Sequence, residues 1–191
     1  MNHHLPSQYD ESWAIPELLE ELSRTSDNLV CLHRSQVSFE QFMVVHVLAV
    51  LEPYYLAIAI DESARFDGLV VAKIEDVDAV TTGGPYLEYL RGSLDFDELR
   101  QSVLARVPDT DQVFDWLVDS RTISMVKTFH GDIFGVIRSI GENLMMLEIF
   151  EDDGDAGGVR FVRMDIVEGI ETLSPTTERV SEKVLSRNVA R

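Results

Sequence analysis

The chain has 191 residues, enough for one medium domain or two small ones, and its composition (45% hydrophobic, 26% charged) is ordinary for a globular protein. No apolar run reaches the roughly 20 residues of a membrane-spanning helix, and the N-terminus lacks the basic-then-apolar pattern of a signal peptide. The single cysteine cannot form an internal disulfide. We therefore expect a cytoplasmic protein that does not act at a membrane.

The net charge of −18 comes from 34 acidic and 16 basic residues. A field of this sign repels phosphate backbones and anionic lipid headgroups, and it favours basic partners. Nucleic acid is therefore an unfavoured partner, and a protein with a basic surface is a favoured one. A well-solvated acidic surface without any such partner would give the same composition.

The first part of the chain predicts one helix followed by five short strands. Apolar residues at helical spacing are Trp13, Ile15, Leu18, Leu19 and Leu22, with Pro16 limiting the first turn. Short apolar runs bounded by turn residues predict strands at 29–33, 42–51, 54–60, 69–73 and 77–80, with a tight acidic corner at 74–76.

A helical connector follows, and then the strand pattern returns. Helical spacing continues through 86–107 and 113–118. The second set of predicted strands is 123–127, 133–140, 144–150, 159–163 and 166–170. The chain from 173 to 191 is polar, with three apolar residues that could line one helical face: Val180, Val184 and Leu185.

The two sets of strands are related by a fixed offset, because Gly158 minus Gly68 is ninety. The same offset, without a gap, pairs Glu52 with Glu142, Leu56 with Met146, Asp61 with Glu151, Glu62 with Asp152, Lys73 with Arg163, Glu75 with Asp165, Val77 with Val167, Val80 with Ile170, Thr82 with Thr172 and Pro85 with Pro175. These pairs agree mainly in residue class, so chance agreement between two strand patterns is the alternative. The shared turn positions favour a duplication.

The order of a helix and five short strands, with a tight corner between strands four and five, resembles the Sm-like small barrel, and it is similar to uncharacterised bacterial proteins of that fold. The segment 162–170 looks like the end of strand four, the corner and strand five of that family, and 71–80 looks like a weaker version. The resemblance implies that Lys73 and Arg163 match a basic RNA-binding position. The glycine that should follow is replaced by Ile74 and Met164, and no aromatic or Asn residue matches the rest of the RNA site.

The predicted fold is therefore mainly β with flanking helices, an α+β chain of two tandem five-stranded Sm-like or SH3-type barrels, each preceded by a helix. The first domain would span 10–90, with its helix, and the helical connector 91–120. The second barrel would span 121–180, and 181–191 would be a polar C-terminal tail. Val77 and Val167, in the two closing strands, should be core residues.

No catalytic, cofactor-binding or metal-binding residue emerges from the sequence. The five histidines are His3, His4, His33, His46 and His130, without paired ligand spacing. The acidic run 151–155 lacks the spacing of a calcium loop and favours a turn between strands. Cys31 lies in an apolar run and is predicted to be a small buried hydrophobe. Of the adjacent Tyr54 and Tyr55, one should face outward, either to anchor a partner or as a half-buried ring.

The function predicted from these observations is a non-enzymatic intracellular interaction module that binds a protein through a barrel edge or through the helices. The alternatives are an Sm-like RNA-binding protein, which requires a contiguous basic or aromatic patch, and an enzyme of an unrecognised class, which requires convergent polar groups in a cleft. The partner and the oligomeric state stay open, with a homo-oligomer among the options.

Overall fold

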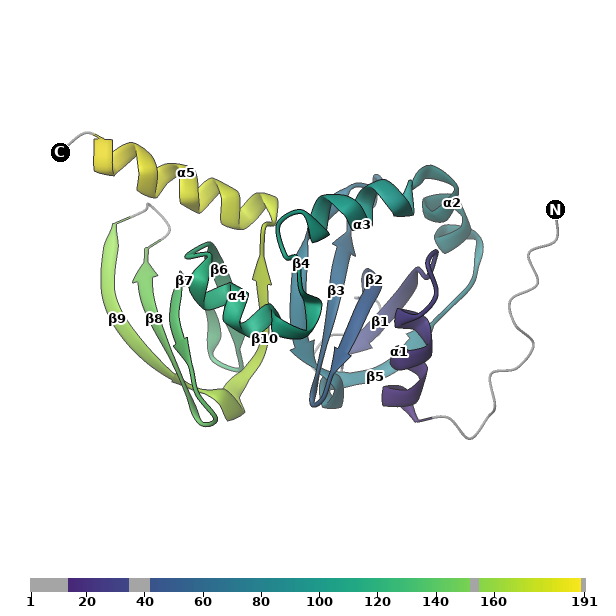
Figure 1. The fold of residues 1–191 in the computed structure, drawn as a ribbon, viewed down its shortest axis with the longest axis horizontal. Coiled ribbons are helices and arrows are strands. Elements are labelled where there is room, and N and C mark those ends of the chain that lie inside the picture. The colour runs from purple at the N-terminus through teal and green to yellow at the C-terminus, as the bar shows by residue number, and fades with distance from the viewer. Residues whose placement is uncertain (1–13, 35–41, 152–154, 190–191) are drawn as a thin grey trace.

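The computed structural model describes residues 14–34, 42–151 and 155–189. Within these residues the chain is α+β and mostly β, with ten strands in one antiparallel sheet and five α-helices (Figure 1). The mainly β fold with flanking helices is confirmed. In the described part of the chain, no helix combines the length and the apolar composition needed to cross a membrane.

The first half contains one helix and five strands, as predicted. Its elements are α1 Ile15–Ser23, β1 Val30–Arg34, β2 Phe42–Leu51, β3 Tyr54–Ile60, β4 Phe66–Lys73, the 3₁₀ turn η1 Ile74–Asp76 and β5 Val77–Thr81. A proline in the first turn fits the start of α1, because its missing N–H would have no partner there. Trp13, expected in this helix, lies outside the described residues.

The connector is helical. Its elements are α2 Pro85–Ser93, α3 Phe96–Leu104, the 3₁₀ turn η2 Thr110–Gln112 and α4 Val113–Asp119. Asp95 caps α3, because its side chain accepts a hydrogen bond from the backbone N–H of Glu98.

The second half repeats the strand order and ends in a helix. Its elements are β6 Ile123–Thr128, β7 Gly131–Ile140, β8 Leu144–Phe150, β9 Ala156–Arg163, the 3₁₀ turn η3 Met164–Ile166, β10 Val167–Thr172 and α5 Pro175–Val189. Residues 181–189, expected to begin a polar tail, therefore continue a helix. Val180 is buried against the sheet and Val184 packs beside it, whereas Leu185 is exposed.

The offset of ninety holds in the geometry as well as in the residue classes. It carries β3 onto β8, β4 onto β9 and η1 onto η3 with identical bounds. Gly68 and Gly158 both adopt a positive φ, of 133° and 92°. The backbone N–H of Ile74 donates to the carbonyl of Pro53 over 2.9 Å, and Met164 donates to the carbonyl of Asn143 over 3.0 Å. The two halves are thus built by the same local interactions.

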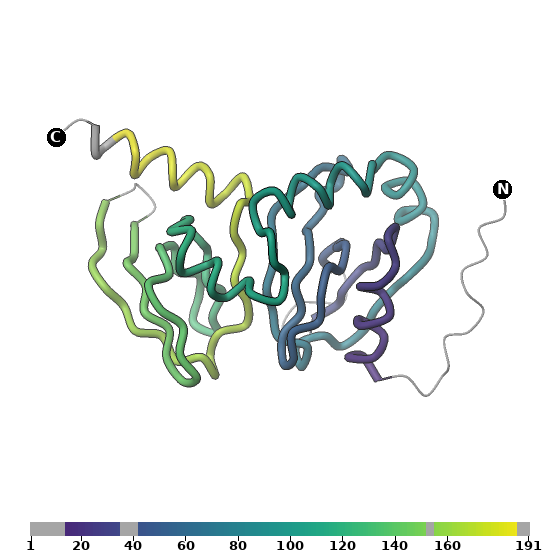
Figure 2. Tube along the Cα trace, viewed as in Figure 1, coloured from purple at the N-terminus to yellow at the C-terminus, as the bar shows by residue number. Residues whose placement is uncertain are grey.

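The ten strands form one continuous sheet, in the order β5-β1-β2-β3-β4-β10-β6-β7-β8-β9. The expected pair of closed barrels is not what this order gives. In the first half, β4 pairs with β3 and β10, and β5 pairs with β1. Because β4 uses its outer edge to bind β10, the sheet runs on into the second half instead of closing on β5. Figures 1 and 2 show the two halves side by side, with β4 and β10 at their junction.

The apolar side chains form two main cores. The first core lies between α1 and the face of β1 to β5 that α1 covers, which we call the inner face, and it includes Leu19, Val45 and Tyr55. The other joins the outer face of β3 and β4 to the connector helices and to the interior of the second half. Val77 and Val167 are both buried, as predicted.

Candidate interaction surface

The histidines of the described chain occupy separate places. His46 is fully buried in β2, and its Nδ1 lies 2.7 Å from the backbone carbonyl oxygen of Asn28. Burial lowers the pKa of His46 below its usual value, although the Asn28 carbonyl opposes this shift. His33 lies 3.1 Å from the hydroxyl of Thr81, and His130 is exposed. These positions indicate structural or surface roles.

The prediction that the chain has no metal site also involved residues that the structure does not describe. His3, His4 and residues 152–154 of the acidic run lie outside the described residues. Within the described residues, no three His, Cys, Asp or Glu side chains gather into a group that could hold a metal ion.

Cys31, Tyr54 and Tyr55 all pack in or against the hydrophobic cores. Cys31 is buried, as predicted, and burial raises the pKa of its thiol, which disfavours the reactive thiolate. Tyr55 is fully buried, and burial raises its pKa to about 12. The ring of Tyr54 is half-buried and packs edge-on against Phe114 of α4, with 5.2 Å between the ring centroids. A freely exposed tyrosine anchor is therefore missing at this pair.

The two basic positions suggested by the Sm-like resemblance are bound to acidic corners. Lys73 Nζ lies 3.5 Å from a carboxylate oxygen of Glu75 and donates a 3.0 Å hydrogen bond to the backbone carbonyl of Asp165. Arg163 forms an ion pair with the carboxylate of Asp165. Both cations are thus partly neutralised, which weakens their attraction for phosphate.

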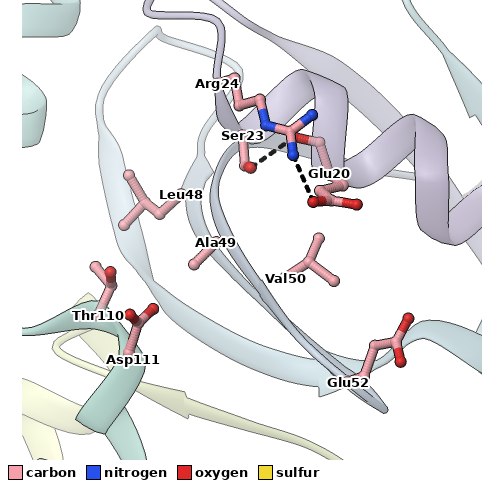
Figure 3. A pocket seen from close by; sticks show the side chains of 9 residues that line it. All are labelled: Glu20, Ser23, Arg24, Leu48, Ala49, Val50, Glu52, Thr110 and Asp111. Carbon is pink, nitrogen blue, oxygen red and sulfur yellow. Dashed lines mark hydrogen bonds and ion pairs between the residues drawn. The ribbon is translucent and has the colours of Figure 1, made fainter.

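A shallow pocket of about 400 Å³ lies between α1, β2 and η2. It is lined by Glu20, Ser23, Arg24, Leu48, Ala49, Val50, Glu52, Thr110 and Asp111 (Figure 3). Arg24 is paired with Glu20 over 2.6 Å, and the Ser23 hydroxyl donates to the Glu20 carbonyl. The Ser23 hydroxyl thus donates to a backbone carbonyl, and the nearby Glu20 carboxylate is paired with Arg24, so the hydrogen bonds of this pocket do not form a nucleophile–base pair.

The outer face of β8 and β9 has a different character, because apolar side chains stand in solvent there. Leu144 is 49% exposed, Val159 is 60% exposed and Phe161 is 66% exposed. Strand register places Met146 directly opposite Phe161, on the same face. We call Leu144, Met146, Val159 and Phe161 the β8–β9 face. Contiguous exposed apolar groups of this kind are typical of interaction sites.

The repeat gives this face a reference within the same molecule. Subtracting ninety places Val159 on Leu69 and Phe161 on Val71, and these two residues of β4 are fully or almost fully buried. They are covered because β10 pairs with β4, placing Ile170 opposite Val71, and because connector helices pack in the same core. The β8–β9 face has the same sequence character as its repeat mate, but it lacks that cover among the described residues.

Comparisons with known proteins add no assignment to this surface. No known family model matches the sequence, and comparisons with curated proteins and with solved structures give no significant match. The Sm-like resemblance thus stays a prediction, and a function can be argued only from the structure of this chain.

The β8–β9 face was missed by sequence reasoning, although a signal for it was present. The short apolar run at 159–163 predicted a strand, but neither face of this strand was assigned from the sequence. The offset of ninety already identified Leu69 and Val71 as the mates of Val159 and Phe161. What the sequence lacked was the sheet order, which leaves β9 at the end of the sheet.

Proposed function

We propose that the chain is a non-enzymatic interaction module, a tandem of two Sm-like or SH3-type units, and that the edge of β9 with the β8–β9 face binds a protein strand. The observation that supports this most is the exposure of Val159 and Phe161 at positions whose repeat mates are buried. The partner would be an extended segment with alternating apolar side chains, added to β9 by backbone hydrogen bonds.

The edge of β9 is suited to such an addition. The strand has eight residues, contains no proline, and pairs only with β8 among the described strands. Its outer N–H and C=O groups can therefore meet a further strand, which is how exposed sheet edges acquire partners. Arg160 is exposed on the same strand, and it would favour an acidic segment over a basic one.

Two properties make RNA and catalysis weaker proposals. The basic positions Lys73 and Arg163 are both engaged by acidic corners, and the net charge of −18 opposes phosphate binding. The pocket between α1 and β2 holds the ion pair of Arg24 with Glu20 and no His or Cys. Protein binding needs neither a basic patch nor a reactive pair.

The test places a photo-reactive amino acid at Val159 and expresses the chain in its native cell. The proposal expects a covalent protein adduct that maps to one extended segment of the partner. Phe161→Glu should abolish the adduct, because it puts a charge into the contact. The matched control is Phe129→Glu, because Phe129 is equally exposed, at 68%, but lies in the turn after β6 and outside the β8–β9 face. An adduct unaffected by Phe161→Glu, or no adduct at all, would contradict the proposal.

A further inference from the structure

The junction between the two halves is an antiparallel pairing of β10 with β4. In its register Ile170 lies opposite Val71 and Glu171 lies opposite Val70. By the offset of ninety, β10 is the mate of β5 and β4 is the mate of β9. The contact inside the chain therefore joins strand five of one unit to strand four of the other.

The mates of these two strands are the ends of the sheet. Among the strands that the structure describes, β5 pairs only with β1, and β9 pairs only with β8. One molecule thus carries a second copy of each junction strand, β5 for β10 and β9 for β4, and each has an edge that pairs with no other described strand. They lie at opposite ends of the strand order, so one chain joins its own β4 and β10 while β5 and β9 stay apart.

Residues of β4 contact atoms across the junction, whereas the corresponding residues of β9 do not. A Cβ on Gly68 would lie 2.8 Å from the Cβ of Ser174, because the segment after β10 presses on it. A Cβ on Gly158 would meet no atom within 4 Å. Lys73 reaches across the junction to the carbonyl of Asp165, whereas its mate Arg163 binds the carboxylate of the Asp165 in its own corner.

We propose that β9 of one copy pairs antiparallel with β5 of a second copy of this chain, in the register of the β4–β10 junction. This rests on the proposed function and names the partner of the same surface. Adding or subtracting ninety places Val80 of the second copy opposite Phe161, and Thr81 of the second copy opposite Arg160. Such a contact is heterologous, because the two surfaces differ, and it builds a ring if the rotation closes and an open chain otherwise.

The chemistry of the two edges fits this pairing. Val80 is half-buried against the first core. In the proposed register it lies directly opposite Phe161, and residues directly opposite each other point to the same side of a sheet. The side chain of Val80 would therefore pack against that of Phe161. β5 follows the acidic corner of Glu75 and Asp76, but Lys73 and Arg34 already pair with these two carboxylates. The fit of the two edges therefore rests on their apolar side chains and not on opposite charges.

One pair predicts that the contact between copies is weaker than the junction within a chain. Inside the chain Gly169 lies opposite Ala72, and even a Cβ on Gly169 would approach Ala72 to 3.2 Å. Between copies the pair would be Ala79 opposite Val162, which is bulkier and holds the strands further apart. Two copies that each carry a charge of −18 also repel each other. The assembly should therefore depend on protein concentration.

The first experiment measures the mass of the purified full chain by sedimentation velocity over a concentration series. The proposal expects species larger than a monomer that grow with concentration. Phe161→Glu should return the chain to a monomer, and Phe129→Glu should assemble like the parent. A chain that is a monomer at every concentration, or an assembly unchanged by Phe161→Glu, would overturn the proposal.

The second experiment tests the register with cysteines in a Cys31→Ala background. Thr81→Cys and Arg160→Cys are placed in separate chains, mixed and oxidised gently. Residues directly opposite in a sheet have Cβ atoms within about 4.5–5.5 Å, close enough for a disulfide with little movement. The mixed disulfide should form faster than the disulfide of either variant alone, and faster than Thr81→Cys with Arg163→Cys. Equal rates would overturn the register.

These results separate this inference from the proposed function. A monomeric purified chain that still gives a Phe161-dependent adduct with a different protein in the cell would end the self-pairing proposal and leave the interaction module standing. If neither an assembly nor an adduct forms, both proposals fail.

Discussion

The ammonium group of Lys73 donates a 3.0 Å hydrogen bond to the backbone carbonyl of Asp165, and so ties the corner of the first half to the corner of the second. The side chain of Lys73 is only 13% exposed, whereas its repeat mate Arg163 is 70% exposed. The same position in the two halves therefore serves different ends. In the first half Lys73 links β4 to the corner before β10, and in the second half Arg163 lies on β9 at the end of the sheet.

Lys73→Met should lower the free energy of unfolding by about 1–2 kcal/mol, because it removes a shielded charge-assisted hydrogen bond while keeping most of the apolar stem. Chemical denaturation of dilute protein measures this. Arg163→Met is the matched control and should have a much smaller effect, because its ion pair with Asp165 is in solvent. Equal losses for the two variants would mean that the bond to Asp165 does not hold the halves together.

Gly68→Ala should destabilise the chain by about 2–4 kcal/mol, because it combines an unfavourable positive φ with a clash against Ser174. Gly158→Ala has the positive φ but open space around the new Cβ, so we expect a smaller loss of about 1–2 kcal/mol. Thermal unfolding at low protein concentration compares the two. A loss for Gly158→Ala as large as that for Gly68→Ala would contradict the open edge.

Val77→Ala and Val167→Ala should each cost about 1–3 kcal/mol, because both side chains are buried where strand five closes its unit. Val159→Ala removes the same atoms from a side chain that is 60% exposed, and its effect on the dilute chain should be under about 0.5 kcal/mol. Denaturant unfolding of all three variants tests the assignment of inner and outer faces. A neutral effect at both Val77 and Val167 would show that the inward face is wrong.

His46 should make stability depend on pH. Burial lowers the pKa of His46 in the folded chain below the usual 6.5, although the carbonyl of Asn28 opposes the shift. As the pH falls, the unfolded chain binds the proton first, so the free energy of unfolding should decrease below about pH 6.5 and continue to do so down to the folded-state pKa. It should recover as the pH is raised again.

The measurement is the free energy of unfolding across this pH range for the parent chain and for His46→Gln, which has no titrating ring. The variant should show a flatter dependence than the parent. His130→Gln is the control, because His130 is exposed, and it should keep the slope of the parent. An unchanged slope in His46→Gln would exclude His46 as the source.

Local structure was largely readable from the sequence, because it depends on neighbours along the chain. Short apolar runs and turn residues located the strands, although β4 and β9 begin earlier than expected, at Phe66 and Ala156. The offset of ninety followed from matching turn positions such as Gly68 and Gly158, whose shared positive φ explains why both are glycine.

The sequence by itself indicated the repeat at an offset of ninety, the order of the elements and the burial of Val77 and Val167, since hydrophobic pattern and turn chemistry are local properties. Only the tertiary structure decided which of two equivalent strands is covered. Leu69 and Phe161 belong to strands of the same kind, but β4 finds β10 in the same chain and β9 reaches the end of the sheet. Strand pairing joins residues far apart in sequence, so exposure at an edge depends on where the sheet ends rather than on the strand's own residues.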